Sequence, residues 1–145
     1  RLLRVGSWIS PQLKPGRAGG PMSAWTASTL AAFAIVEEVR IVTQRQDGSL
    51  RRPRIIWVVA LSDRLFIRSV NGRDADWFRW AIATGTGQLE ASGTAYDVTF
   101  TEAQEGDLDA VDAAYQGKYG RRYASIVRDL CRPVPRAATL QVHLA

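Results

Sequence analysis

The sequence has little of the two residues that most often bind transition metals, because Cys131 and His143 are its only cysteine and histidine. A single cysteine excludes an intramolecular disulfide framework and is typical of the reducing cytoplasm, where we expect this protein to function. One cysteine and one histidine cannot form a Cys/His zinc site, and no His-Glu-x-x-His spacing occurs. No Gly-x-Ser-x-Gly turn positions a serine for a hydrolytic triad with His143. The sequence therefore predicts no metal site and identifies no catalytic residue.

Long hydrophobic runs and a broad excess of charge are also missing. No segment approaches the roughly 18 apolar residues of a membrane-spanning helix, so we expect no membrane partner. Of the net charge of +5, residues 1–21 contribute +4, and the remaining chain carries 15 basic and 14 acidic residues. Because phosphate backbones are bound by clustered cations, this balance gives no case for a nucleic-acid partner.

Residues 1–21 differ from the remainder in composition. Seven of them are proline or glycine, a density that supports neither a helix nor a strand ladder. Met22 directly precedes Ser-Ala-Trp-Thr and looks like an initiator. We therefore expect residues 1–21 to be a disordered arm or a non-native upstream extension, and residues 22–145 to form a single domain.

Beyond this segment, the pattern alternates short strands with helices. Short apolar runs and apolar-polar alternation between turn residues predict strands. The expected strands are residues 39–45, 54–61, 65–70, 88–91, 96–101 and 138–144. Apolar residues at three-to-four spacing behind capping residues predict helices. The expected helices run from Thr26 to about Glu38, onward from Asp74 or Asp76, from Asp107 to Tyr119, and from Tyr123 to Leu130.

Six short strands with helices between them predict an α+β protein built on a small antiparallel six-stranded split β-barrel with helical inserts. Closing a sheet into a barrel removes exposed edges that would otherwise pair with other chains. We expect the strand at residues 138–144, which is far along the chain from its partners, to complete the closure.

The candidate site lies in residues 54–80, where a strand-turn-strand unit leads to an Asn-Gly corner and an aromatic-rich helix. Arg54, Arg68 and Arg73, together with Ser69, are placed to converge near that corner. Guanidinium groups match phosphate well, and N–H groups at a helix start add to the attraction. The corner is therefore a candidate site for an anionic group.

Structural interpretations of the same residues stay open. Strand arginines commonly face solvent with packed stems, and Trp57 and Trp77 have the spacing of core residues. The run Lys118–Tyr123 interleaves bases with aromatics, as some nucleic-acid surfaces do, but it fits the C-terminus of a helix better. His143 has no acidic partner visible in the sequence and is expected at the surface.

Six motifs follow one another from residue 22 onward. They are Ser-Ala-Trp-Thr-Ala-Ser-Thr-Leu, Asp-Gly-Ser-Leu-Arg-Arg-Pro, Ile-Trp-Val-Val, Phe-Ile-Arg-Ser-Val-Asn-Gly-Arg, Asp-Val-Thr-Phe and Asp-Ala-Ala-Tyr-Gln-Gly-Lys-Tyr-Gly. In composition and order they resemble a bacterial family catalogued as domain of unknown function 2255. The resemblance covers nearly all of residues 22–145, and the family brings no assigned activity with it.

More distantly, Gly48–Val59, Leu65–Ser69, Asn71-Gly72 and Trp77-Phe78 resemble the FMN-binding split barrels and their deazaflavin-dependent nitroreductase branch. This resemblance implies a cofactor such as FMN or a deazaflavin coenzyme, which itself carries out hydride transfer. The cofactor-binding residues that it implies are Arg54, Trp57, Arg68, Ser69, Asn71, Arg73 and Trp77. Among them the three arginines and the serine would hold phosphate, and one of the tryptophans would line the ring pocket.

One departure from that branch concerns the phosphate. The nitroreductases usually have a lysine directly after the corner serine, where this chain has Val70, and their corner segment is longer. Arg68 or Arg73 would have to replace the missing cation.

Two hypotheses follow. The first is a flavin- or deazaflavin-binding oxidoreductase, forming a homodimer and transferring hydride to a small molecule. The second is a non-enzymatic module on the same fold that binds a small molecule or a protein without a cofactor. The retained arginines and serine favour the first hypothesis, and Val70 with the shortened corner favours the second.

Overall fold

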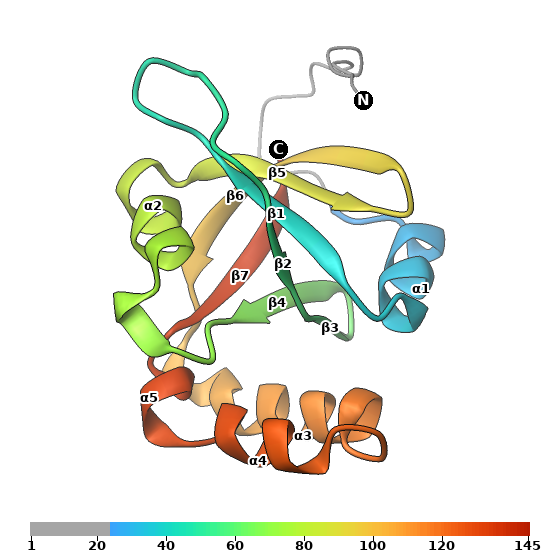
Figure 1. The fold of residues 1–145 in the computed structure, drawn as a ribbon. Coiled ribbons are helices and arrows are strands. Elements are labelled where there is room, and N and C mark those ends of the chain that lie inside the picture. Colours follow the sequence, from blue (N-terminus) through green and yellow to red (C-terminus); the bar gives the residue numbers. More distant parts are fainter. Residues whose placement is uncertain (1–23) are drawn as a thin grey trace.

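The computed structural model describes residues 24–145 of the chain (Figure 1). The arm expected at residues 1–21 and the expected initiator, Met22, lie outside the described residues. The strands in the described range are β1 (Val39–Thr43), β2 (Arg54–Ile56), β3 (Val58–Leu61), β4 (Arg64–Arg68), β5 (Thr86–Ala91), β6 (Thr94–Glu102) and β7 (Thr139–Leu144). The helices are α1 (Ala27–Ile35), α2 (Asp76–Thr84), α3 (Leu108–Tyr119), α4 (Ala124–Leu130) and α5 (Pro133–Arg136), with 3-10 turns η2 (Gly72–Asp74) and η3 (Glu105–Asp107).

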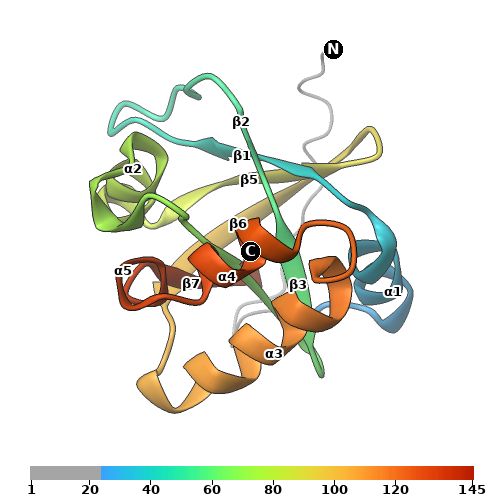
Figure 2. The same cartoon turned by 60° about the horizontal axis from the view of Figure 1, so that its bottom comes forward.

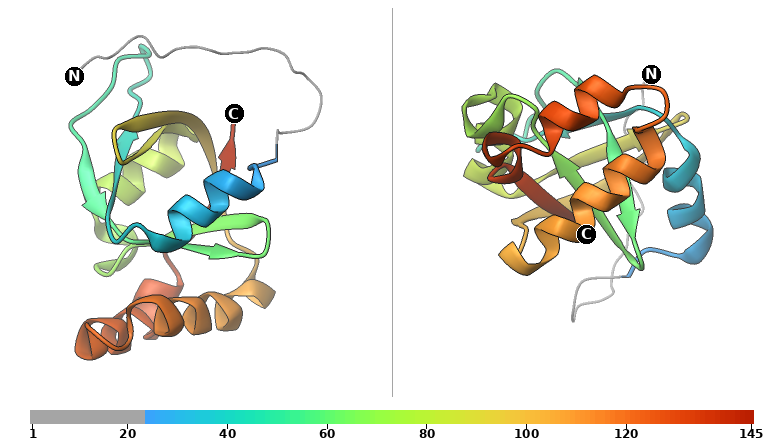
Figure 3. Two further views of the ribbon diagram at one scale, coloured as in Figure 1. Left: turned by 90° about the vertical axis from the view of Figure 1, so that its right-hand side faces the viewer. Right: turned by 90° about the horizontal axis from the view of Figure 1, so that it is seen from below.

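These strands form one antiparallel sheet of order β2-β1-β5-β6-β7-β4-β3, which curls into a nearly closed barrel (Figure 1, Figure 3). The edge strands β2 and β3 are separated in sequence by Trp57 alone, so the chain itself joins the two edges. The expected α+β class and split-barrel architecture are confirmed.

The described part of the sheet has seven strands and not the six expected, because residues 54–61 do not form one strand. Ile56 of β2 pairs with Val39 of β1, whereas Val58 of β3 pairs with Ile67 of β4 at the opposite edge. One straight strand cannot pair with both edges, so the chain turns between the two halves. The last strand, β7, lies between β6 and β4 and joins the β5–β6 hairpin to the β3–β4 hairpin.

Two apolar cores position the site. The first fills the barrel and includes Phe33, Trp77 and Phe78. The second lies between the β3–β4 hairpin and the layer of α3 and α4, where Phe66 and Tyr115 are fully buried. Figure 2 shows this helical layer across one end of the barrel. A site between the barrel and the layer therefore has one wall from each.

Candidate functional site

Backbone hydrogen bonds hold the corner that follows β4. Ser69 N–H donates to Ala138 O, and Gly72 N–H donates to Ser69 O, each at 3.0 Å. Gly72 has a φ of +76°, and a Cβ there would lie 2.5 Å from Cγ1 of Val134, so this position requires glycine. The η2 turn then leads into α2, which begins at Asp76 without a side-chain cap.

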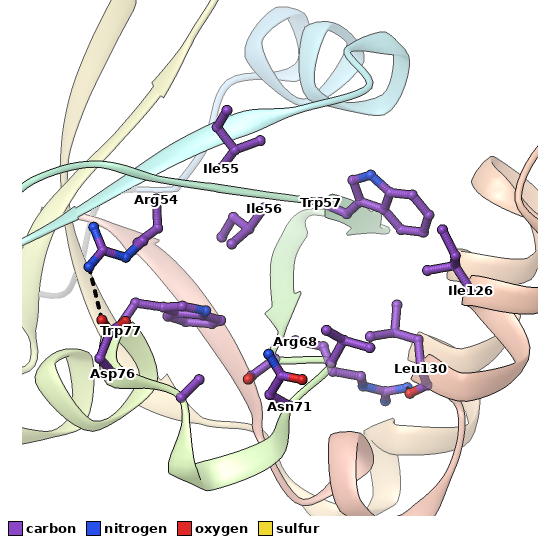
Figure 4. Close-up of a pocket in the computed structure, with 13 residues that line it drawn as sticks. Arg54, Ile55, Ile56, Trp57, Arg68, Asn71, Asp76, Trp77, Ile126 and Leu130 are labelled. Carbon is purple, nitrogen blue, oxygen red and sulfur yellow. Dashed lines mark hydrogen bonds and ion pairs between the residues drawn. The ribbon is translucent and has the colours of Figure 1, made fainter.

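A pocket of about 450 Å³ lies between β2, the corner, the start of α2 and helix α4 (Figure 4). Small-molecule sites typically have roughly 300–1,000 Å³ and a mostly apolar lining with a few polar groups. The lining residues are Arg54, Ile55, Ile56, Trp57, Arg68, Ser69, Val70, Asn71, Ala75, Asp76, Trp77, Ile126 and Leu130. In size and character the pocket suits an organic ligand.

The structure brings six of the seven predicted cofactor-binding residues to this pocket, namely Arg54, Trp57, Arg68, Ser69, Asn71 and Trp77. Arg73 is the exception and does not line it. Its guanidinium donates to both carboxylate oxygens of Glu102, at 2.7 and 3.1 Å, and to Ala137 O at 2.9 Å. Arg73 therefore connects the corner to the end of β6 and to the segment before β7.

Arg54 and Asp76 face each other from β2 and α2 (Figure 4). Arg54 Nη2 donates to Asp76 Oδ2 at 2.9 Å, and the guanidinium also lies 5.2 Å from the centre of the Trp80 ring. The hydrogen bond from Arg54 lowers the pKa of the Asp76 carboxyl below its ordinary value of 3.8. Asp76 is therefore ionised at neutral pH and balances the charge of Arg54.

Arg68 is a buried strand residue and not the solvent-facing one that the structural interpretation expected, since its side chain is 0% exposed. Nε donates to Thr139 Oγ1 at 2.8 Å, and Nη1 donates to Leu130 O at 3.2 Å and to the Asp112 carboxylate. Asp112 also pairs with Arg136. Arg68 thus ties β4 to β7, α3 and α4, and its charge is already balanced.

Two polar side chains of the corner offer hydrogen bonds to the pocket. Ser69 is 2% exposed, and its hydroxyl has no hydrogen-bond partner among residues 24–145. Asn71 is exposed beside it, and its side chain does not cap the turn that follows. A buried hydroxyl left unsatisfied costs about 1–3 kcal/mol, so buried polar groups normally have a partner. The Ser69 hydroxyl is therefore a buried polar group at the pocket wall whose hydrogen-bonding capacity is unused within residues 24–145.

The two pocket tryptophans come from different cores. Trp57 stacks face to face on Tyr119 of α3, with ring centres 4.0 Å apart. Trp77 belongs to the barrel core and meets Phe78 edge to face at 5.9 Å. Both tryptophans pack in or against a core and also line the pocket. The core interpretation and the pocket-lining interpretation are therefore both correct for these residues.

Sequence reasoning missed the wall that α4 contributes. Ile126 and Leu130 line the pocket from this helix, and Figure 4 labels both at the α4 side of the pocket. Their four-residue spacing indicates a shared helix face, but nothing local says which element that face meets. Asp76 was expected only as the start of a helix, and its role as the partner of Arg54 depends on β2.

Residues 24–145 offer little support for a metal site, a membrane span or a nucleic-acid surface. No group of three or more histidine, cysteine, aspartate or glutamate side chains there could hold a metal ion. Every helix in that range is too short or too polar to span a bilayer. The basic-aromatic run at residues 118–123 is used inside the fold, where Lys118 Nζ donates to Phe33 O and Val58 O, both at 2.7 Å.

A nearly closed antiparallel barrel with a helical layer over one end and a pocket between the two defines a protein of the split β-barrel class. Within this class, the chain belongs to the family described as "Uncharacterized protein conserved in bacteria (DUF2255)", whose model matches residues 29–142. The family resemblance seen in the motifs is confirmed. No functionally curated protein matches the sequence.

Several solved structures share the fold at low sequence identity. A conserved hypothetical protein from Mycobacterium tuberculosis has a TM-score of 0.60 at 8% identity, covering 90% of this chain and 85% of that one. ChuZ from Campylobacter jejuni has a TM-score of 0.58 at 12% identity, covering 81% of this chain but only 51% of ChuZ. An FAD and heme binding protein from Mycobacterium smegmatis has a TM-score of 0.53 at 15% identity, covering 86% of this chain and 67% of that one. Identities this low establish the fold alone.

Proposed function

We propose that the protein binds a flavin or deazaflavin cofactor, such as FMN, in the pocket between the barrel and α4, and uses it to transfer hydride to a small molecule. The observation behind this proposal is the pocket of about 450 Å³. Six of the residues expected to bind the cofactor line it, and one of them, Ser69, has a hydroxyl without a partner among residues 24–145. The shared fold with the FAD and heme binding protein from M. smegmatis supports it.

The pocket side chains fit a planar ring with a polar edge. Trp57 and Trp77 offer aromatic surface, and Leu130 contributes apolar surface that excludes water. The Ser69 hydroxyl and the Asn71 amide supply both donors and acceptors. A bound cofactor would itself supply the hydride chemistry, so the task of these residues is to bind it, orient it and keep water out.

The alternative is a binding module without a cofactor, and one observation favours it. Arg54 and Arg68, the two arginines among the lining residues, each have a carboxylate partner, and Val70 stands at the corner. A cofactor held chiefly through its phosphate would therefore find no free cation there. On this alternative, the pocket binds some other small molecule or a protein segment.

Titration of the purified protein with FMN and with a deazaflavin coenzyme distinguishes these proposals. We expect a chromophore that co-purifies with the protein, or that stays with it through desalting after cofactor is added, together with quenching of tryptophan fluorescence, because Trp57 and Trp77 line the pocket. Trp57→Phe should remove part of the quenching. Trp25→Phe is the matched control, because Trp25 lies in the barrel core outside the pocket and should leave the quenching unchanged. The absence of both chromophore and quenching would overturn the oxidoreductase proposal.

We also propose that the protein acts in the cytoplasm as a homodimer. The observation that supports a dimer is a group of exposed aliphatic side chains at the pocket mouth, Ile55, Val70 and Ile126. Exposed apolar side chains gathered around a pocket are typical of interaction surfaces.

A further inference from the structure

The Asp76 carboxylate occupies the place where a ligand phosphate would be expected to bind. Phosphate groups favour guanidinium forks and the N-terminal N–H groups of helices. In this pocket the accessible guanidinium is that of Arg54, and the helix start is that of α2. Asp76 Oδ2 lies 2.9 Å from Arg54 Nη2, and Asp76 is the first residue of α2, where a negative charge is favoured by the helix dipole. The chain therefore supplies its own anion to both groups.

The other cations near the corner are no more available. The Arg68 guanidinium is enclosed and binds Asp112, and that of Arg73 binds Glu102 outside the pocket. Each of these guanidinium groups already donates to a carboxylate, so its positive charge is paired before any phosphate arrives. The pocket thus offers an anionic ligand no unbalanced positive charge.

The rest of the pocket is uncharged. Its polar groups are the Ser69 hydroxyl and the Asn71 amide, which pair with carbonyl, imide or hydroxyl groups as well as with charged ones. The remaining surface is aromatic and aliphatic, from Trp57, Trp77 and α4. These are the groups that contact a flat heteroaromatic ring with a polar edge.

We propose that the pocket recognises a neutral heteroaromatic ring and not a phosphate, and that Asp76 is the residue that sets this preference. This inference rests on the proposed function and deepens it, because it names the ring of a flavin-class ligand, as in riboflavin, as the part that is bound. Asp76 repels an anionic substituent and holds Arg54 away from it.

A comparison of riboflavin with FMN, which differ only in the phosphate, tests the proposal on the wild-type protein. We expect dissociation constants within about threefold of each other, and no competition from inorganic phosphate. FMN binding more than about tenfold tighter than riboflavin would overturn the inference while leaving the proposed function intact. If the protein binds neither flavin, and also does not bind the deazaflavin ring with or without its phosphate, both the proposed function and this inference are overturned.

Asp76→Asn tests the role of the carboxylate. The variant frees Arg54, so the preference for FMN over riboflavin should rise about tenfold. The double variant Arg54→Gln/Asp76→Asn should return it to the wild-type value. Asp74→Asn is the matched control, because Asp74 carries the same charge two residues earlier but does not line the pocket, and it should change nothing. Thermal unfolding verifies folding, and Asp76→Ser serves as a second replacement. An unchanged preference in folded Asp76 variants would overturn the assignment.

Discussion

At the scale of single residues, arginines of identical chemistry meet different surroundings. Arg68 is enclosed, whereas the Arg73 side chain is 47% exposed. Solvent screens an exposed ion pair, so such a pair contributes little to stability. Removing one member of a buried pair leaves an uncompensated charge, which is costly. The same substitution should therefore have unequal effects at these two positions.

We predict that Arg68→Met lowers the free energy of unfolding by about 3 kcal/mol. The substitution removes one cationic partner of Asp112 and the hydrogen bonds that Arg68 donates to Thr139 Oγ1 and Leu130 O. Arg73→Met should lower it by less than about 1 kcal/mol. Urea denaturation of the two variants measures both values. Equal losses would contradict this assignment of a structural role to Arg68.

Lys118 is a second residue whose surroundings matter. Burial lowers the pKa of its ammonium group to about 8 from the ordinary value of 10.5, and the nearby Glu37 charge opposes the shift. Between these two values the folded protein has released the proton while the unfolded chain still holds it. Because the unfolded state then binds more protons, the free energy of unfolding increases as pH rises between these two pKa values.

We predict that the wild-type protein shows this gain between about pH 7.5 and about pH 9.5, and that Lys118→Met and Lys118→Arg both lack it. Neither replacement titrates in this range. The Cys131 thiol, whose pKa burial raises, works in the opposite direction within this window, so the Lys118 contribution is the difference between the wild type and the two variants. Tyr115 and Tyr119, whose pKa values burial also raises, oppose it only as the unfolded tyrosines ionise near pH 10. Urea denaturation at the two pH values provides the measurement, and a gain that persists in Lys118→Met would assign it to another group.

At the scale of elements, helix α3 covers the free edge of β3. Strand β3 pairs only with β4, so the other side of Val58 would be exposed as an unpaired edge. Tyr119 Oη accepts from Val58 N–H at 3.3 Å and donates to Glu37 O at 2.7 Å, while Lys118 Nζ donates to Val58 O. Side chains from the helix thus satisfy the backbone groups where the barrel nearly closes.

We predict that Tyr119→Phe lowers the free energy of unfolding by about 1–2 kcal/mol and accelerates hydrogen exchange at the Val58 amide, because that amide loses its partner. Tyr123→Phe is the matched control. The Tyr123 hydroxyl donates to the Glu37 carboxylate and touches no strand edge, so the Val58 amide should keep its protection. Exchange measured by NMR decides the point, and equal acceleration in both variants would count against the edge-capping role.

At the scale of the whole molecule, the pocket belongs to neither the barrel nor the helical layer alone. The barrel contributes the corner and β2, and α4 contributes the opposite wall (Figure 4). Aliphatic side chains around the mouth remain exposed, among them Ile126 at 45%. A second copy of the chain seated over this mouth would remove them from water.

We predict that the wild-type protein elutes with the mass of a dimer and that Ile126→Glu shifts it toward the monomer, because a charge would be placed in an apolar interface. Ile35→Glu is the control, since Ile35 is 82% exposed at the end of α1 and does not line the pocket. Size-exclusion chromatography with light scattering gives the masses. A monomeric wild type, or equal effects of the two substitutions, would contradict the proposed interface.

Much of this architecture could be predicted from the sequence, because strand alternation and helix spacing are local patterns. Thr26 caps α1 as expected, although the helix ends at Ile35 and not near Glu38. The break at Trp57 could not be predicted, because residues 54–61 are locally a good strand and only pairing with both edges of the barrel divides them.

The sequence by itself determined the α+β class, most of the strands and helices, the family motifs and the corner where the candidate residues gather. Only the tertiary structure decided which of those residues carry a free group. Asp76, Glu102 and Asp112, which neutralise the three arginines, lie 22, 29 and 44 residues from their partners. A local sequence pattern determines which side chains share one face of a strand or helix. The partner of a charged side chain depends on how elements that are distant in sequence pack together.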